Sequence, residues 1–324
     1  MYSTKTKNGS TCVKTALLVL ILVLALAMAL PLAACQKKSE TVTLKIGAQN
    51  YAEVITLAYM AEALIEDQSD YEVEVVPRLG SVVVLDQAMQ TGDVDIASLY
   101  FTGGASGLLH PDIVKQVEDI NDPKWRDAAV VFAFVRETSR KTLGREWLEP
   151  LGYENTYAIT VRREMAEQYN LDKVSDLKGL SQDLIIGMDD AYMDRAIDGY
   201  QPLLKLYDLD PFAKTATMQI NLLYQAIRDQ QVDVGVAYSS DARIYAYDLV
   251  WLEDDRNLYP PFEAAFAINL SALEKAPGID TILSQLSGQI DIDTIRQLNY
   301  EVDINQRDHK EVALEFLKER KILD

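Results

Sequence analysis

The stretch TVTLKIGAQNYAEVITLAYMAEALIEDQSDYEVEVV, residues 41–76, decides the fold class. Its first part, TVTLKIGAQ, alternates apolar and polar side chains, which predicts a strand. The segment AEVITLAYMAEALIED carries apolar side chains at helical spacing, and YEVEVV then alternates again. A helix between two strands, continued along the chain, predicts an α/β fold with a largely parallel sheet.

An internal similarity suggests that two units of this kind are built alike. LDQAMQTGDVDIASLY (85–100) and LYQAIRDQQVDVGVAY (223–238) share six residues of sixteen at a constant offset of 138. Each is predicted to be a helix that leads into a strand ending in tyrosine. Tyr100 and Tyr238 would then lie at the carboxyl ends of strands, where open α/β sheets bind ligands.

The first 34 residues predict a secretory signal. Lysines precede an apolar run at residues 16–34, a run that alone could also be an uncleaved membrane anchor. The residues LAAC, 32–35, resemble the lipobox of bacterial lipoproteins, whose cysteine becomes the lipidated N-terminus. We therefore expect a cleaved signal peptide (1–34), a lipid anchor at Cys35 on the extracytoplasmic face of the cell membrane, and a short tether (35–40). Whether an outer membrane is present stays open.

Composition excludes two functional classes. Cleavage would remove Cys12 and leave only the lipidated Cys35, so disulfides and thiolate catalysis are not expected. The whole chain has a net charge of −19, and without the three lysines of the signal its 28 basic residues face 50 acidic ones, a net charge of −22. Because phosphate contacts need a basic surface, we expect no nucleic acid partner.

The motifs of the common enzymes and metal sites are absent from the sequence, which contains no GxSxG, HExxH, GxxxxGK[ST] or GxGxxG. The two histidines, His110 and His309, have no cysteine or second histidine at metal-ligand spacing. The adjacent acids at 189–190 and 254–255 are typical of solvated surface. We expect no catalytic residue, no metal and no cofactor; a surface lipoprotein that is an enzyme or adhesin is the remaining alternative.

The stretch DVGVAYSSDARIYAYDLVWLEDDRNLYPPF, residues 233–262, is rich in aromatic side chains. A quaternary ammonium has no N–H to donate, so hydrogen bonds cannot select it. Aromatic faces can, because the ring quadrupole attracts the cation by about 2 kcal/mol or more per face when desolvated. A tyrosine more often packs in a core, so only aromatic rings that face a cleft would serve this purpose.

Several long motifs, in the same order along nearly the whole mature chain, carry a family resemblance. They include IGAQNYAEVITLAYMAEALIE, GDVDIASLYFTGG, WLEPLGYENTYAITVRREMAEQYNL, AYMDRAIDGY and LNYEVDINQRDHKEVALEFLKE. With these motifs the chain resembles the glycine betaine/carnitine/choline-binding lipoproteins of osmoprotectant ABC importers.

The resemblance implies an α/β, periplasmic-binding-protein-like fold of type II, with two lobes and a ligand cleft between them. It implies two hinge crossings, near residues 147–152 and 250–255. Lobe 1 then comprises residues 41–148 and 254–324, and lobe 2 comprises residues 149–253. A cage of aromatic side chains around the trimethylammonium group would be complete only when the lobes close.

The resemblance also implies which residues form the cage. Tyr157 in NTYAI and Tyr238 in VAYSSD match cage positions of the family, and Phe262 in PPFEAA stands where the family usually has tyrosine. The fourth member is Tyr100 if no gap follows VDIAS, or Phe101 if FTGG matches the YTGT-like motif of the family. The internal similarity favours Tyr100. Neighbours on a strand point to opposite faces, so only one of the two is expected to line the cleft.

Two departures from the family pattern concern the polar end of the ligand. The family often has glutamine where this chain has Val54, and a polar residue where it has Gly103 or Gly104. Polar contacts are then expected from backbone N–H groups near Gly103 and Gly104, or from Asn50. The choice between glycine betaine, choline and carnitine stays open.

We therefore expect a monomeric, extracytoplasmic binding component that delivers a quaternary-ammonium solute to the permease subunits of an ABC importer in the membrane. The alternative is the same fold binding another small solute, such as an amino acid or a polyamine. A charged clamp would then replace the aromatic cage.

Overall fold

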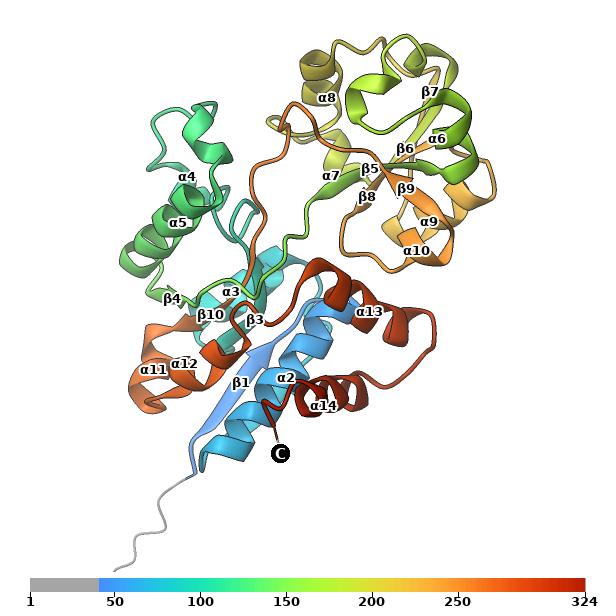
Figure 1. Ribbon diagram of the computed structural model, residues 1–324. Helices are drawn as coiled ribbons and strands as arrows, with labels where there is room; N and C mark the ends of the chain where they lie inside the picture. The colour runs from blue at the N-terminus through green and yellow to red at the C-terminus, as the bar shows by residue number, and fades with distance from the viewer. Residues whose placement is uncertain (1–40, 324) are drawn as a thin grey trace, which may run out of the picture. The chain divides into compact units, whose positions relative to one another are not determined.

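Two five-stranded sheets organise residues 41–323, the part of the chain that the computed structural model describes (Figure 1). The predicted signal peptide, the tether and Cys35 lie outside these residues. From Val42 onward the described residues form one compact unit. Among them, no helix combines the length and the apolar character that crossing a membrane requires.

The first sheet has the strand order β2-β1-β3-β10-β4. β1 is parallel to β2 and β3, whereas β10 is antiparallel to β3 and β4. Leu44 and Ile46 of β1 are fully buried, which explains the alternation of apolar residues in the sequence. The strands are β1 (Thr43–Gly47), β2 (Glu72–Val76), β3 (Ile96–Phe101), β4 (Arg145–Trp147) and β10 (Ala264–Asn269).

The second sheet has the strand order β7-β6-β8-β5-β9. β6 is parallel to β7 and β8, whereas β5 is antiparallel to β8 and β9. The pattern of directions is therefore the same as in the first sheet. The strands are β5 (Tyr157–Arg162), β6 (Ile185–Met188), β7 (Lys214–Thr217), β8 (Val234–Tyr238) and β9 (Leu249–Trp251).

The internal similarity of the sequence corresponds to equivalent units of the two sheets. The helix α3 (Val82–Thr91) precedes β3, and the helix α9 (Ile220–Arg228) precedes β8; both strands are the central members of their sheets. Gly92 ends α3 in the left-handed conformation, with φ at 78°, which favours glycine.

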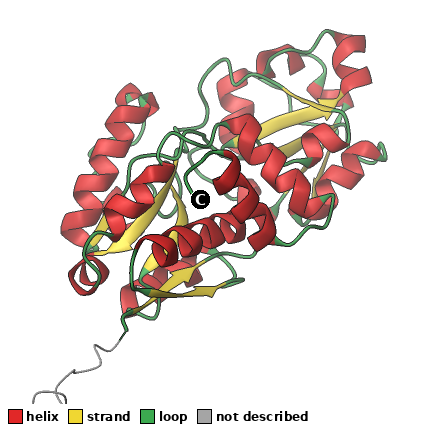
Figure 2. Ribbon diagram, turned by 60° about the horizontal axis from the view of Figure 1, so that its bottom comes forward, coloured by secondary structure: helices red, strands yellow, loops and turns green. Residues whose placement is uncertain are grey.

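Each sheet has a hydrophobic core on both faces. Helices pack against the sheets (Figure 2). Besides α3 and α9, the helices are α2 (Ala52–Gln68), α4 (Pro111–Val114), α5 (Ala128–Thr142), α6 (Arg163–Tyr169), α7 (Asp190–Met193), α8 (Tyr200–Tyr207), α10 (Arg243–Ala246), α11 (Leu270–Lys275), α12 (Ile279–Leu283), α13 (Ile292–Asp303) and α14 (His309–Glu319). On the first sheet, one core holds α2 and the C-terminal helices, and the other holds α3 and α5. On the second sheet, α6 and α8 contribute to one core and α9 to the other.

The chain passes between the sheets in two segments, from β4 to β5 and from β9 to β10. The long stretch at 104–147 forms α4, a 3-10 turn at Pro123–Arg126, α5 and β4. Trp125 and Val131 of this stretch are buried beside Trp147 in the core of the first sheet. The stretch therefore extends that core.

Candidate functional site

A cavity of about 500 Å³ is lined by residues of both sheets and their connecting segments. Its size is in the range typical of small-molecule sites, and it is larger than the roughly 150 Å³ that holds a benzene molecule. Of the residues predicted from the sequence, the cavity brings together Asn50, Phe101, Gly104, Tyr157, Tyr238 and Phe262. Tyr100 and Gly103 are not among its lining residues.

Two tyrosines of the second sheet form one wall. β5 and β8 pair so that Tyr157 lies opposite Tyr238, with ring centroids 5.4 Å apart. Behind them, the rings of Tyr192 and Tyr259 lie 4.9 Å and 5.8 Å from that of Tyr157 and support it. The Tyr238 hydroxyl donates to Asp189 Oδ2 at 3.2 Å. Burial raises the pKa of Tyr157 to about 12 and that of Tyr238 further, so both rings are neutral at physiological pH.

Two phenylalanines, one in the first sheet and one in the segment that leads into it, also line the cavity. Phe101 is the last residue of β3 and is paired with Ala264 of β10. Phe262 precedes Ala264 by two positions, so it lies close to Phe101. Thr102 fixes the two segments to each other, because its hydroxyl donates to Pro261 O at 3.1 Å and accepts from Glu263 N at 3.0 Å. Each sheet, with the segment that leads into it, thus supplies two of the four side chains that we name the aromatic cage: Phe101, Tyr157, Tyr238 and Phe262. Tyr51 also lines the cavity.

A β-bulge explains why Phe101, and not Tyr100, reaches the cavity. Between the pairs Ala97–Ala267 and Tyr100–Ala265, β3 has one residue more than β10. Such an extra residue reverses the alternation of side chains beyond it. Tyr100 therefore points into the core beside Trp147 and is 1% exposed. The preference for Tyr100 from the internal similarity assumed an uninterrupted strand, and β3 is interrupted.

The two glycines after this strand have different surroundings. A Cβ on Gly103 would lie 2.4 Å from the carbonyl oxygen of Pro261, so only glycine fits this close approach. Gly104 lines the cavity, as does Asn50, whereas Val54 is buried in the core. The departure from the family pattern at Val54 therefore adds no polar group to the cavity.

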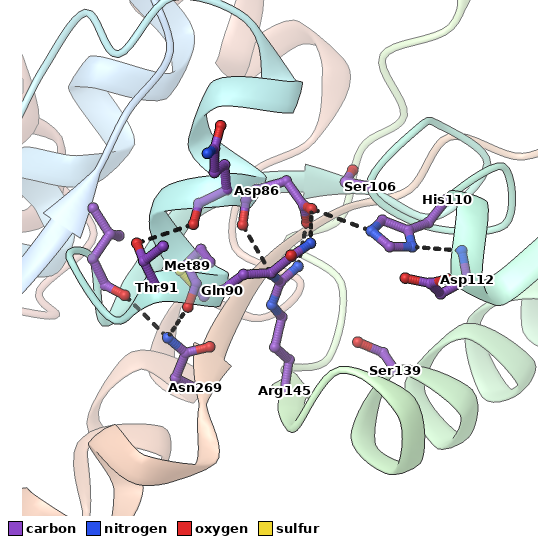
Figure 3. A network of polar contacts seen from close by, with 12 residues as sticks. Asp86, Met89, Gln90, Thr91, Ser106, His110, Asp112, Ser139, Arg145 and Asn269 are labelled. Carbon is purple, nitrogen blue, oxygen red and sulfur yellow. Dashed lines mark hydrogen bonds and ion pairs between the residues drawn. The ribbon is translucent and has the colours of Figure 1, made fainter.

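The loop after Gly104 is held by a buried polar network (Figure 3). Arg145 of β4 and His110 converge on the carboxylate of Asp86 in α3, with His110 Nε2 at 3.2 Å from Asp86 Oδ2. His110 Nδ1 accepts from Asp112 N at 3.1 Å, so Nε2–H is the donor to Asp86. Ser106, at the cavity, accepts from Phe101 N at 3.2 Å. The network ties this part of the cavity rim to the core of the first sheet.

Arg195 is a cavity residue that the sequence analysis missed. Its guanidinium carbon lies 5.2 Å from the centroid of the Tyr157 ring. Nε and Nη2 donate to the two oxygens of Asp198, each at 2.6 Å, so the guanidinium is oriented by a bidentate ion pair. Its Nη1 makes no hydrogen bond to any described residue, and it remains able to bind an anionic group. Arg195 lies within the quoted motif AYMDRAIDGY, which was its one signal in the sequence.

The two histidines and the paired acids form hydrogen bonds that stabilise the fold. His309 Nδ1 lies 3.0 Å from the hydroxyl of Thr56. Asp189 caps α7 by accepting from Tyr192 N, and Asp254 accepts from the backbone N–H groups of residues 258 and 259. Within residues 41–323, no group of three or more histidine, cysteine or acidic side chains is arranged to hold a metal ion.

Arg296 of α13 links its helix to the second sheet. Its guanidinium carbon lies 4.1 Å from the ring centroid of Trp251 in β9, and the side chain is 4% exposed. Nε donates to Ser239 O at 2.8 Å and Nη1 to the hydroxyl of Tyr245 at 2.7 Å. α13 itself packs in the core of the first sheet with α2. One side chain therefore contacts both halves of the protein beside a predicted crossing.

Replacing Arg296 with alanine is expected to lower the free energy of unfolding by about 2 kcal/mol, because the hydrogen bonds of a buried charged group and its cation–π contact are lost. Small-angle X-ray scattering is expected to show a larger radius of gyration. Arg307→Ala is the control, because its ion pairs with Glu301 and Glu315 are more exposed and contribute about 0–1 kcal/mol. Equal behaviour of the two variants would contradict a linking role for Arg296.

Three comparisons relate the chain to known proteins. The sequence profile of one family, "Substrate binding domain of ABC-type glycine betaine transport system", matches residues 42–319. The carnitine transport binding protein OpuCC of Listeria monocytogenes is 37% identical over 276 residues, which are 85% of this chain and 86% of that protein. The glycine-betaine-binding protein of Pseudomonas aeruginosa is 29% identical over 297 residues, 88% and 90% of the two chains.

A solved structure supports the same relation. The crystal structure of a glycine betaine/carnitine/choline ABC transporter protein superposes on this chain with a TM-score of 0.76 and 32% sequence identity. The superposition covers 87% of this chain and 100% of the other.

Proposed function

Because the chain belongs to the family of substrate-binding domains of ABC-type glycine betaine transport systems, we propose that it captures a trimethylated zwitterion in the aromatic cage and delivers it to a membrane permease. The family resemblance and the two-lobed, periplasmic-binding-protein-like fold expected from the sequence are confirmed. The protein is an extracytoplasmic substrate-binding component of an ABC importer, and its family is one of transport proteins, not enzymes.

The aromatic cage supports a quaternary-ammonium head. Two of its rings are phenylalanines without a hydroxyl, and the two tyrosines are neutral, so the cage offers π faces and no fixed charge. Such faces attract a trimethylated cation by their quadrupole and cover its methyl groups. Two carnitine- and glycine betaine-binding relatives are consistent with this class of ligand.

Arg195 is the reason for proposing a zwitterionic ligand over a purely cationic one. It lines the same cavity as the aromatic cage, beside Tyr157, and its Nη1 can donate to a carboxylate. Glycine betaine and carnitine have that carboxylate, whereas choline has only a hydroxyl. We therefore rank the two zwitterions above choline.

The lobe boundaries predicted from the sequence divide the aromatic cage between the two lobes. Phe101 and Phe262 belong to lobe 1 (41–148 and 254–324), and Tyr157 and Tyr238 to lobe 2 (149–253), so closing the lobes completes the cage. The closed, liganded monomer would be the form that the permease recognises. A lipid anchor at Cys35 would keep it at the membrane.

A binding screen tests the proposal. Glycine betaine and carnitine are expected to raise the melting temperature and to give measurable heats in calorimetry, choline to bind more weakly, and proline and spermidine not to bind. Stabilisation by spermidine or proline alone would favour the alternative solute class and would contradict the proposal.

Replacing Tyr157 or Tyr238 with alanine is expected to weaken binding of either zwitterion by tenfold or more, about 1.4 kcal/mol, because each change removes one wall of the aromatic cage. Calorimetry on the purified variants measures the change. Tyr169→Ala is the matched control, since Tyr169 is exposed at the end of α6 and does not line the cavity. Equal affinities in all three variants would mean that the ligand does not contact the cage.

A further inference from the structure

Glu53 is a buried carboxylate in the wall of the cavity. It lies in the first turn of α2 and is 2% exposed. It forms no ion pair with any lysine, arginine or histidine that the structure describes. An ionised carboxylate in such a position is costly unless it is hydrogen-bonded or meets a cation.

Four uncharged donors surround the Glu53 carboxylate. Oε1 accepts from the Tyr153 hydroxyl at 2.8 Å and from Asn155 Nδ2 at 3.4 Å. Oε2 accepts from Ser240 Oγ at 2.5 Å and from Asn299 Nδ2 at 3.2 Å. The donors come from the segment between β4 and β5, from the loop after β8 and from α13. The carboxylate is thus oriented by three separate parts of the chain.

These donors adjoin the aromatic cage. Asn155 precedes Tyr157 by two residues, and its backbone N–H donates to Phe262 O at 3.1 Å. Ser240 follows Tyr238 by two residues. Glu53 is therefore hydrogen-bonded to the segments that carry Tyr157 and Tyr238, is connected to that of Phe262 through Asn155, and lines the same cavity.

The other charges of the cavity leave a negative excess. The two arginines that line it are each paired with an aspartate, Arg195 with Asp198 and Arg243 with Asp241. Glu53 and Asp303 also line it, and neither forms an ion pair with a described residue. Asp303 is exposed, so among the described residues that line the cavity Glu53 is the buried carboxyl group without an ion-pair partner.

We infer that Glu53 supplies the negative charge that holds a trimethylated cation in the aromatic cage, and that its hydrogen bonds from both lobes bring this charge into place when the lobes approach. The inference rests on the proposed function. Burial raises the pKa of Glu53, against the effect of its four hydrogen bonds, and a cation beside it would favour the ionised form.

A pair of ligands that differ only in charge tests this role. Glycine betaine and 3,3-dimethylbutanoate have the same shape and the same carboxylate, but carbon replaces the quaternary nitrogen in the second. Glu53→Gln is expected to lower the affinity for glycine betaine at least tenfold and to change that for 3,3-dimethylbutanoate less than twofold. Competition calorimetry measures both. Glu53→Asp, which keeps the charge, is expected to retain most of the glycine betaine affinity.

Glu62→Gln is the matched control. Glu62 is a buried glutamate of the same helix that pairs with Lys310 and does not line the cavity, so its replacement is expected to leave both affinities unchanged. Equal losses for the two ligands in Glu53→Gln, or equal losses in the Gln and Asp variants, would show that Glu53 only supports the structure. A wild-type protein that binds no trimethylated solute would instead contradict the proposed function itself.

Discussion

Replacing Asp86 with alanine is expected to lower the free energy of unfolding by about 3–5 kcal/mol, the range found when one partner of a buried ion pair is removed. Arg145 is 1% exposed, and its guanidinium would lose its only carboxylate among the described residues. His110 would lose the acceptor of its Nε2–H. Urea denaturation of the two proteins at pH 7 measures the difference.

Two comparisons sharpen this prediction. Asp112→Ala removes a carboxylate whose pair with Lys115 is exposed, so a loss of about 0–1 kcal/mol is expected. Asp86→Leu combined with Arg145→Met removes both charges and is expected to recover much of the lost stability, because no unpaired charge remains in the core. If Asp86→Ala is no less stable than Asp112→Ala, the network does not support the loop.

The same carboxylate makes stability depend on pH in a defined window. Burial opposes ionisation of Asp86, but hydrogen bonds from His110 and Arg145 outweigh it and lower the pKa to about 2. Since the pKa in an unfolded chain is about 3.9, the contribution of the ion pair is present above about pH 4 and is lost as the pH falls towards 2. Asp86→Asn is expected to flatten the stability curve between these values.

Replacing Arg195 with methionine is expected to weaken binding of glycine betaine and carnitine by roughly ten- to hundredfold, because a hydrogen bond to a charged group contributes about 1.5–3 kcal/mol. Choline, which has no carboxylate, is expected to bind with nearly unchanged affinity. The difference between the two kinds of ligand, measured by calorimetry, separates loss of the carboxylate contact from damage to the aromatic cage.

A second variant tests whether the loss of affinity in Arg195→Met results only from lower stability. Asp198 is 1% exposed and would be left without its partner in Arg195→Met, which lowers stability. The double variant Arg195→Met with Asp198→Asn is expected to restore the melting temperature but not the affinity for the zwitterions. Recovery of affinity together with stability would mean that Arg195 acts only through folding.

Local sequence patterns predicted the parts of the fold that depend on local rules. The alternation in TVTLKIGAQ and the helical stripe after it correspond to β1 and α2, because burial on one face imposes the period of each element. The internal similarity located α3–β3 and α9–β8 in the same way. It could not place Tyr100, because the bulge in β3 depends on pairing with β10, more than 160 residues later.

Local sequence patterns could not predict the polar residues of the site. Arg195 and Glu53 are single charged residues in helical or loop segments, where most charged side chains are solvated. Their role depends on neighbours such as Asp198, Ser240 and Asn299, and for Glu53 these lie 187 and 246 positions away in the sequence. Only the folded chain brings these groups together.

The stacking of Arg296 on Trp251 gives the protein an optical property of its own. Of the three tryptophans, Trp125 and Trp147 are enclosed in the core of the first sheet, while Trp251 is partly exposed and covered by a cation from the other half of the molecule. Indole emission responds to a neighbouring charge and to water. Separation of the two halves would thus alter the fluorescence of Trp251, so opening of the protein can be followed without an added label.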